Sequence, residues 1–183
     1  CGVMAQARLT LLWRQFDGLE VDLCRRCNRV RRCAPLGTLF AAVSRLGNGV
    51  FWYGLIAVLP LVYGEQGLSV SLQMLACAAV GLAVYKLLKN RLVRERPYVW
   101  HPEIGCGAPP LDRFSFPSGH TLHAVCFSTI ALASLPELAW LLLPFTALVA
   151  ASRVVLGLHY PTDVLAGAAI GYVIAQTGLL LFA

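Results

Sequence analysis

The decisive segment reads Phe114-Ser115-Phe116-Pro117-Ser118-Gly119-His120-Thr121-Leu122-His123, a short polar motif directly before a long apolar run. Pro117 fits the first turn of a helix, because its missing N–H group would have no partner there. Ser118 and Gly119 then leave backbone N–H groups free, and the helix dipole adds positive potential at the same place. The segment therefore predicts a helix start that binds an anion such as phosphate on the N–H groups of Gly119 and His120.

The composition of the whole chain is that of a membrane protein. Of its 183 residues, 58% are hydrophobic and only 13% are charged, and the mean hydropathy is +0.68. Soluble domains carry about 25% charged residues, so the bilayer is the expected solvent. The net charge of +6 comes from basic residues beside apolar segments. Because no basic face interleaved with aromatic residues appears, we expect no nucleic-acid partner, and membrane lipids or anionic substrates instead.

Five apolar segments predict an all-α integral membrane bundle of about five transmembrane helices. They cover residues 46–63, 68–88, 118–135, 138–156 and 163–182, and we expect the first to extend back past Arg45. Each is near the ~20 residues that cross a bilayer. Residues 8–33 carry too many arginines to cross and predict an interfacial amphipathic helix. We predict one domain over residues 1–183, with 1–35 as the N-terminal interfacial segment and 36–183 as the bundle.

The connections between these segments differ in length. Residues 64–67 predict a short turn, whereas residues 90–115 carry charges and four prolines and predict a long loop or partial helix at the surface. Loops of this length are often functional. In the last apolar segment, Gly167 and Gly171 have the Gly-x-x-x-Gly spacing that lets helices approach closely, so we interpret them as a packing device.

The seven cysteines do not form a familiar disulfide framework. Cys24, Cys27 and Cys33 are the only cluster, and no fourth ligand is evident, so we predict free thiols and no metal site, with the role of the three left open. Cys77 and Cys126 lie in apolar segments and are interpreted as small buried hydrophobes.

Ionisable and polar residues gather at the ends of the apolar segments. Counting spans places the end of the second, the start of the third, the end of the fourth and the start of the fifth on one membrane face. These ends carry Lys89, Arg96, Ser118, His120, Arg153, His159 and Asp163. Because such groups are costly near hydrocarbon and are usually retained for function, we expect them to form a site.

Three ordered motifs carry a family resemblance. They are Lys89 followed after six residues by Arg96-Pro97, then Pro117-Ser118-Gly119-His120, then Ser152-Arg153 followed after five residues by His159 and after three more by Asp163. In these motifs the chain resembles the membrane-bound type 2 phosphatidic acid phosphatase (PAP2) superfamily, and within it the small bacterial lipid phosphate and undecaprenyl diphosphate phosphatases. The resemblance covers about residues 40–183, and three motifs in order make it specific.

The chemistry of phosphoryl transfer agrees with what the resemblance implies. Catalysis needs cations around the phosphate oxygens, which Lys89, Arg96 and Arg153 would supply, with Ser118 and the Gly119 N–H group completing the phosphate site. Singly, the basic residues also fit headgroup or helix-end anchors, but the ordered set favours a site.

Two histidines and an aspartate complete the expected machinery. By the resemblance, His159 is the nucleophile that forms a phosphohistidine. Asp163 lies one helical turn away and can hold one ring nitrogen, although it also fits a simple N-terminal cap. His120 fits the general acid and then the general base. We interpret His123 as a packed or pore-lining residue. Arg91 and Arg94 fit contacts with substrate headgroups, but we favour a solvated basic loop.

The leading hypothesis is metal-independent hydrolysis of a lipid phosphate or diphosphate, of the polyprenyl diphosphate or phosphatidic acid type, with no cofactor. A lipid phosphotransferase using the same intermediate is an alternative. A non-catalytic lipid-binding membrane protein is disfavoured, because His120, His159 and Asp163 are all present. A soluble vanadate-binding peroxidase is disfavoured by the apolar segments. The oligomeric state is left open.

Two arguments about membrane sidedness disagree. Five spans put the N-terminus on the face of the polar residues, which holds nearly all Lys and Arg, and the positive-inside rule then makes this face cytoplasmic. The resemblance implies the outer face of a bacterial inner membrane. The arginines between residues 25 and 32 belong to the amphipathic segment rather than to a loop between spans, which weakens the charge argument. We therefore predict an active site on the periplasmic face.

Overall fold

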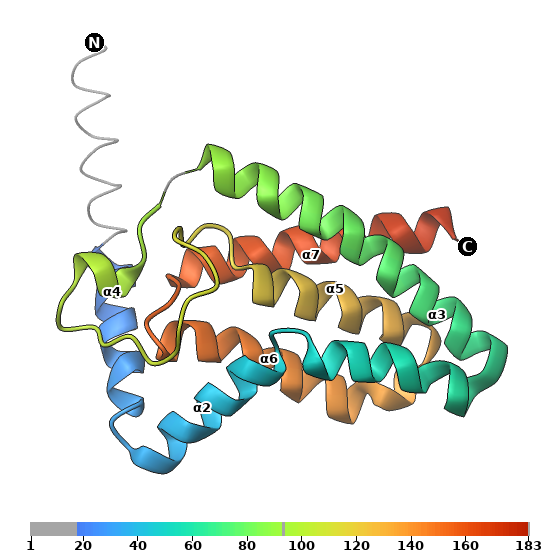
Figure 1. The fold of residues 1–183 in the computed structure, drawn as a ribbon, viewed down its shortest axis with the longest axis horizontal. Coiled ribbons are helices and arrows are strands. Elements are labelled where there is room, and N and C mark those ends of the chain that lie inside the picture. The colour runs from blue at the N-terminus through green and yellow to red at the C-terminus, as the bar shows by residue number, and fades with distance from the viewer. Residues whose placement is uncertain (1–17, 93, 183) are drawn as a thin grey trace, which may run out of the picture.

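A computed structural model describes residues 18–92 and 94–182 of the chain. Every regular element in these two ranges is helical, which confirms the all-α prediction. A helix over 18–30 is followed by α2 (Ala34–Leu46), α3 (Val50–Arg91), α4 (Pro97–Trp100), α5 (Gly119–Ser134), the 3₁₀ helix η1 (Pro136–Leu138), α6 (Ala139–Val155) and α7 (Pro161–Leu181). Figure 1 shows the long helices running side by side along the long axis of the molecule.

Helix α3 consists of two arms that fold back on each other at Gly64. This residue has φ 57° and ψ −131°, a left-handed conformation that glycine adopts without steric cost. Across the arms, the Ser71 hydroxyl donates a hydrogen bond of 2.8 Å to the Ile56 carbonyl. A Cβ atom on Gly67 would come within 2.1 Å of the Leu59 carbonyl oxygen, so the arms approach at backbone distance. The turn expected over residues 64–67 is confirmed.

The chain turns between α2 and α3. Helix α2 ends before Gly47, and Gly49 has φ 135°, a conformation that side chains rarely allow. The expectation that the first apolar span continues back past Arg45 is therefore wrong, because two glycines separate the helices and carry Asn48 on a tight turn.

Three helical stretches of the described chain are long and apolar enough to cross a membrane, namely Val50–Arg91, Pro136–Val155 and Pro161–Leu181. Helix α5 has 16 residues. At 1.5 Å per residue it is about 24 Å long, shorter than a hydrocarbon core of about 30 Å. The number of five spans therefore stays a prediction.

The starts of α5 and α7 are locked together by small residues. A Cβ atom on Gly167 would lie 2.5 Å from the Ser118 carbonyl oxygen, and one on Gly171 would lie 2.2 Å from that of Leu122. The Ser118 N–H group also donates to the Asp163 carbonyl at 3.0 Å. The predicted packing role of the two glycines is confirmed, and it joins the second and third sequence motifs.

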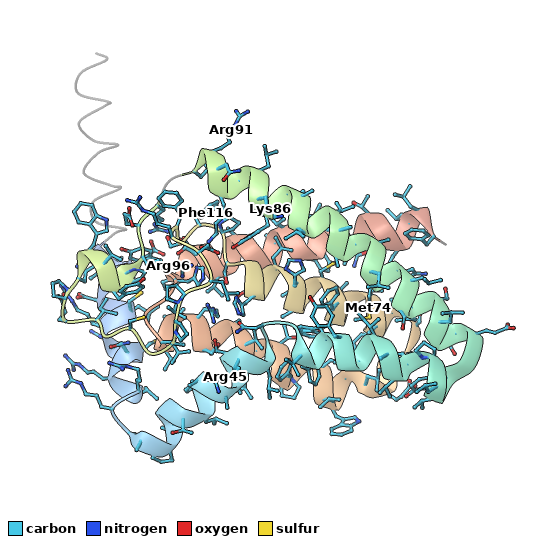
Figure 2. The ribbon with its side chains drawn as sticks, viewed as in Figure 1. Arg45, Met74, Lys86, Arg91, Arg96 and Phe116 are labelled. Atoms are coloured by element: carbon cyan, nitrogen blue, oxygen red, sulfur yellow. The ribbon has the colours of Figure 1, made fainter. Side chains whose placement is uncertain are left out.

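The bundle has an apolar interior and one polar end. Fully buried side chains such as Trp52, Met74 and Leu142 fill the space between the helices. Figure 2 shows Met74 among the helices and Arg96 among the loops at one end. The end of α3, the start of α5, the end of α6 and the start of α7 all lie toward this end (Figure 1), as the span count predicts.

The helix over 18–30 packs against the loops at the polar end. The Asn28 amide donates to the carbonyls of Gly105 and Val155, each at 2.9 Å, and accepts the Gly105 N–H at 3.0 Å. Its position at a membrane surface stays a prediction, and residues 8–17 of the expected amphipathic helix lie outside the described residues.

Candidate active site

A tight turn between α6 and α7 positions His159. The Arg153 carbonyl accepts the N–H groups of Leu158 at 3.0 Å and His159 at 3.1 Å, so the chain folds back directly after α6. Gly157 makes this possible with φ +72°, and a Cβ atom there would meet the Gly105 carbonyl oxygen at 2.8 Å. His159 is only 2% exposed. The third motif thus brings a cation and a histidine to one turn.

Asp163 faces His159 and also caps α7. Its Oδ2 lies 3.7 Å from Nδ1 of His159, longer than a hydrogen bond, and accepts the Tyr160 N–H at 2.8 Å. Its Oδ1 accepts a hydrogen bond of 2.9 Å from Arg94. The orienting and capping functions that sequence analysis treated as alternatives are therefore compatible in one carboxylate.

Arg94 is not part of a solvated loop, so that interpretation is wrong. Besides its ion pair with Asp163, it pairs with Glu20 at 2.7 Å, and its guanidinium lies 4.0 Å from the centre of the Tyr160 ring. Glu20 also accepts the Thr162 N–H at 2.8 Å. No local signal identifies this network, because Glu20 and Arg94 are 74 residues apart in sequence.

Arg96 covers the other ring nitrogen of His159. Its Nη1 lies 3.3 Å from Nε2 of His159 and donates to the Leu158 carbonyl at 2.7 Å. A guanidinium has no lone pair to offer, so Nε2 must be the acceptor and Nδ1, on the Asp163 side of the ring, carries the hydrogen. Nε2 is therefore the unprotonated ring nitrogen, and its electron pair faces Nη1 of Arg96.

The surroundings of His159 keep its imidazole neutral. Burial lowers the pKa of His159 to about 4, and the positive charges of Arg153 and Arg96 act in the same direction, against the opposing effect of Asp163. A neutral imidazole is the form that can attack phosphorus.

Asp112 is a member of the cluster that sequence analysis missed. Its carboxylate contacts Lys89 and the Tyr85 hydroxyl, and it accepts a hydrogen bond of 2.8 Å from Arg96. Lys89 also donates to the Phe114 carbonyl. Asp112 lies in the long loop before α5, where acidic residues are common, so its position in the sequence did not single it out.

The end of α2 and the turn that follows it supply partners for two further predicted residues. His120 Nε2 contacts the Asn48 side-chain oxygen, and the Arg153 guanidinium contacts the Ser44 hydroxyl. Arg153 is buried, and its Nε has no hydrogen-bond partner among the residues that the structure describes. At the start of α5, Ser118 occupies the N-cap position, and its hydroxyl lies 3.0 Å from that of Thr121.

The backbone N–H groups of Gly119 and His120 belong to the first turn of α5, where no intrahelical acceptor exists. All eight predicted site residues therefore lie at the polar end of the bundle. Direct contacts or shared turns join them, while their roles stay predictions.

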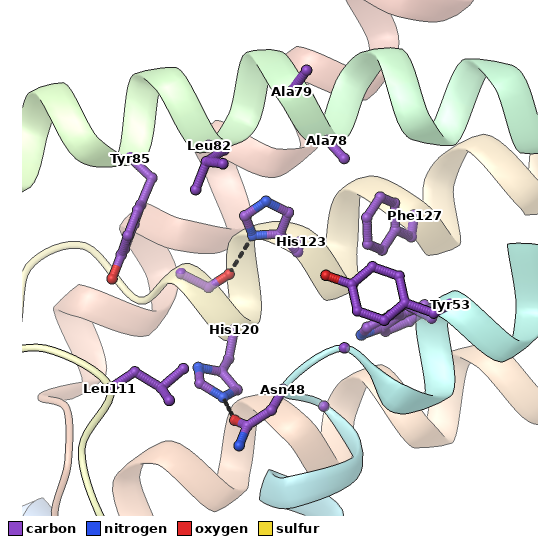
Figure 3. A pocket seen from close by; sticks show the side chains of 14 residues that line it. Asn48, Tyr53, Ala78, Ala79, Leu82, Tyr85, Leu111, His120, His123 and Phe127 are labelled. Carbon is purple, nitrogen blue, oxygen red and sulfur yellow. Dashed lines mark hydrogen bonds between the residues drawn. The ribbon is translucent and has the colours of Figure 1, made fainter.

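A pocket of about 350 Å³ lies beside this cluster, lined by both arms of α3 and by α5. Figure 3 shows His120 next to Asn48 at one part of its wall and His123 at another. The remaining wall is largely apolar and includes Leu82 and Phe127. His123 Nδ1 lies 2.9 Å from the Gly119 carbonyl oxygen. His123 thus lines this pocket, and its interpretation as non-catalytic stays a prediction.

The three clustered cysteines have separate environments. Cys24 is fully buried, and its thiol contacts the His159 carbonyl at 3.9 Å, whereas Cys33 is exposed. Burial raises the pKa of Cys24 to about 12, so this thiol stays protonated at neutral pH.

The sequence profile of the PAP2 superfamily matches residues 71–182. The chain belongs to the PAP2 superfamily. It is 29% identical to an undecaprenyl-diphosphatase of Sulfolobus acidocaldarius over 159 residues, which is 86% of this chain and 75% of that protein. It is 36% identical to a decaprenylphosphoryl-5-phosphoribose phosphatase of Mycobacterium tuberculosis over 98 residues, which is 52% of this chain and 52% of that protein.

The fold agrees with a solved PAP2 structure. The crystal structure of a transmembrane PAP2-type phosphatidylglycerolphosphate phosphatase of Bacillus subtilis superposes with a TM-score of 0.72 at 25% identity, covering 91% of this chain and 86% of that one. Because its relatives are named phosphatases, the chain is a phosphatase of the PAP2 superfamily. Its long apolar helices are those of a membrane protein.

Proposed function

We propose that this PAP2 phosphatase hydrolyses a terminal phosphate from a membrane lipid phosphate or diphosphate, without a metal, through a phosphohistidine at His159. One observation carries the proposal. The buried imidazole of His159 is held between Arg96 on Nε2 and Asp163 on the Nδ1 side. A neutral nucleophile aimed at a basic site is what attack on a phosphate requires.

In the first step, the electron pair on Nε2 of His159 forms a bond to phosphorus while the bond from phosphorus to the lipid oxygen breaks. His120 donates a proton to that departing oxygen. Lys89, Arg96 and Arg153 neutralise the charge on the three other phosphate oxygens, and the N–H groups at the start of α5 bind one of them. The unpartnered Nε of Arg153 supports this assignment, since a phosphate oxygen would satisfy it.

In the second step, water attacks the phosphohistidine. His120, now neutral, takes a proton from that water, the bond between phosphorus and Nε2 breaks, and inorganic phosphate leaves. Asp163 stabilises the hydrogen on Nδ1 of His159 throughout, which keeps Nε2 available.

The pocket supports a position for the lipid chain. Because His120 lines it, the leaving oxygen protonated by His120 would continue into the apolar wall formed by Leu82, Ala78 and Phe127. A polyprenyl or acyl chain matches that wall. Relatives named as an undecaprenyl-diphosphatase and a decaprenylphosphoryl-5-phosphoribose phosphatase favour a polyprenyl-linked phosphate or diphosphate as the substrate class.

We also propose one domain whose catalytic bundle covers residues 36–183, with five spans in an inner membrane and the site on the periplasmic face. Cys24 is buried and makes a poor reporter of sidedness, whereas Cys106 is exposed in the long loop. A variant that retains Cys106 as its single cysteine is expected to react with a membrane-impermeant thiol reagent in intact cells. Reaction only after lysis would place the site on the cytoplasmic face.

Purified protein in detergent tests the activity. A panel of undecaprenyl diphosphate, phosphatidic acid and phosphatidylglycerolphosphate should release inorganic phosphate in EDTA, and vanadate should inhibit because it adopts the geometry of the transition state. Loss of activity in EDTA with recovery in Mg²⁺ would overturn the metal-independent mechanism. Labelled substrate supplied with acceptor lipids distinguishes hydrolysis, in which the label leaves as free phosphate, from transfer.

A further inference from the structure

Two cations of the proposed phosphate site already share an internal anion. Oδ1 of Asp112 contacts both Lys89 and Arg96, and Oδ2 accepts a hydrogen bond from the Tyr85 hydroxyl. The Asp112 backbone carbonyl also accepts from Nε of Arg96 at 3.1 Å. One residue of the long loop thus binds the first motif with both its side chain and its backbone.

These contacts leave Arg96 little capacity for a phosphate. Its Nε and Nη2 donate to Asp112, while Nη1 donates to the Leu158 carbonyl and faces His159. Arg binds phosphate best through two parallel N–H groups. A phosphate oxygen can therefore take the Nη2 hydrogen that Asp112 Oδ1 accepts only when the Asp112 side chain leaves.

The Asp112 side chain is ionised and has room to leave. Burial by itself would raise the pKa of Asp112, but hydrogen bonds from Lys89 and Tyr85 hold it below the ordinary aspartate value. The side chain is 29% exposed, whereas those of Lys89 and Arg96 are 8% and 1% exposed. The anion therefore sits at the accessible side of the two cations, where a phosphate would arrive.

We propose that Asp112 is an internal substitute for phosphate, which occupies Lys89 and Arg96 in the empty site, is displaced by the substrate and returns to expel the product. This inference rests on the proposed function for the identity of the anion. Lys89, Arg96 and Arg153 would repel one another if no anion were bound, so Asp112 also keeps the empty site stable. The cost of displacing it weakens the binding of every phosphate species by the same factor, including the product.

The test compares Asp112→Asn with Glu103→Gln, a control in the same loop whose exposed carboxylate pairs with Arg25 at 2.7 Å, outside the site. The measurements are the thermal stabilisation of the detergent-solubilised protein by inorganic phosphate and by vanadate, and product inhibition of turnover. In Asp112→Asn, the dissociation constants of both anions should fall by about tenfold or more, equivalent to about 1.4 kcal/mol. Product inhibition should become correspondingly stronger. Glu103→Gln should behave as wild type.

Weaker or unchanged phosphate binding in Asp112→Asn would overturn the proposal, since it would mean that Asp112 only positions the cations. If that variant does not fold, Tyr85→Phe removes one hydrogen bond to Asp112 and should tighten phosphate binding by a smaller factor, about threefold. Unchanged or weaker phosphate binding in Tyr85→Phe would also overturn the proposal. Thermal stabilisation does not depend on turnover, so a protein that binds phosphate as predicted but releases none from lipids would contradict the proposed function and leave this inference standing.

Discussion

The polar cluster around His159 and the pocket beside His120 hold their histidines in different ways. His159 is enclosed by charged partners, Arg96 on one ring nitrogen and Asp163 near the other. His120 has a hydrogen bond with the neutral Asn48 and lines a largely apolar pocket. The difference fits the proposed roles, in which the nucleophile has a fixed tautomer and charged neighbours and the proton donor has access to the place where the leaving group lies.

The largest expected effect is that of His159→Ala. Loss of the nucleophile should reduce kcat by at least about 10⁵-fold, in line with losses of nucleophiles elsewhere. Phosphate release from the preferred lipid measures it, and acid-labile phosphate trapped on the wild-type protein should map to His159. His101→Ala is the control, because His101 lies at the surface near Glu103. Substantial activity in His159→Ala, or label on another residue, would remove His159 from its role.

Asp163→Asn should cost about 10⁴-fold in kcat, because an amide can stabilise the wrong tautomer of His159. A small residual activity is expected, since Arg96 still faces Nε2. Kinetics and a thermal unfolding midpoint should be measured together, as Asp163 also caps α7. Activity near the wild-type value in a folded variant would show that Asp163 serves only as the cap.

His120→Gln sharpens the comparison between the two histidines. With an alkyl or polyprenyl leaving group, loss of the proton donor should reduce kcat by about 10³-fold. With p-nitrophenyl phosphate, whose leaving group needs no proton, the loss should be much smaller, whereas His159→Ala should be equally inactive on both substrates. Equal losses on the two substrates in His120→Gln would contradict the general-acid role.

Arg94→Ala should reduce kcat by about 10²-fold, because Asp163 loses a partner that holds it and small displacements at a nucleophile are costly. It should also shift the pH profile. Neutral His159 is required, so kcat/KM falls as pH drops through the His159 pKa of about 4. Without Arg94, Asp163 stabilises the imidazolium more strongly, the pKa rises, and the fall should begin at a higher pH.

Arg113→Ala is the matched control for Arg94→Ala, because Arg113 is exposed and pairs with Glu95 at 3.2 Å. It should change neither kcat nor the pH profile. A fall in activity in Arg94→Ala with an unmoved pH profile would indicate a purely structural role for Arg94.

The smallest expected effect concerns the pocket. Ala79→Leu adds bulk to its wall and should lower kcat/KM for a long-chain lipid by about tenfold while leaving a short soluble phosphate ester unaffected. Ala83→Leu, one helical turn further along the same arm of α3, is the control. Equal losses of kcat/KM in the two variants, or a loss of activity on the short ester, would show that the pocket does not bind the lipid chain.

The sequence by itself determined the all-helical class, the break at residues 64–67, the close packing of Gly167 and Gly171, and membership of the superfamily. Each of these depends on short-range patterns, namely apolar segments, turn residues and fixed spacings within motifs. The same patterns placed the eight predicted site residues at helix ends, which the fold brings to one end of the bundle.

Only the tertiary structure decided which partners these residues have. Asp112 on Arg96, Asn48 on His120, Ser44 on Arg153 and Glu20 on Arg94 are joined across 16, 72, 109 and 74 residues of sequence. Buried polar groups require partners, but any nearby carboxylate, amide or hydroxyl can serve. Which group does so depends on how the helices and loops pack, so the local sequence around each partner does not predict the pairing.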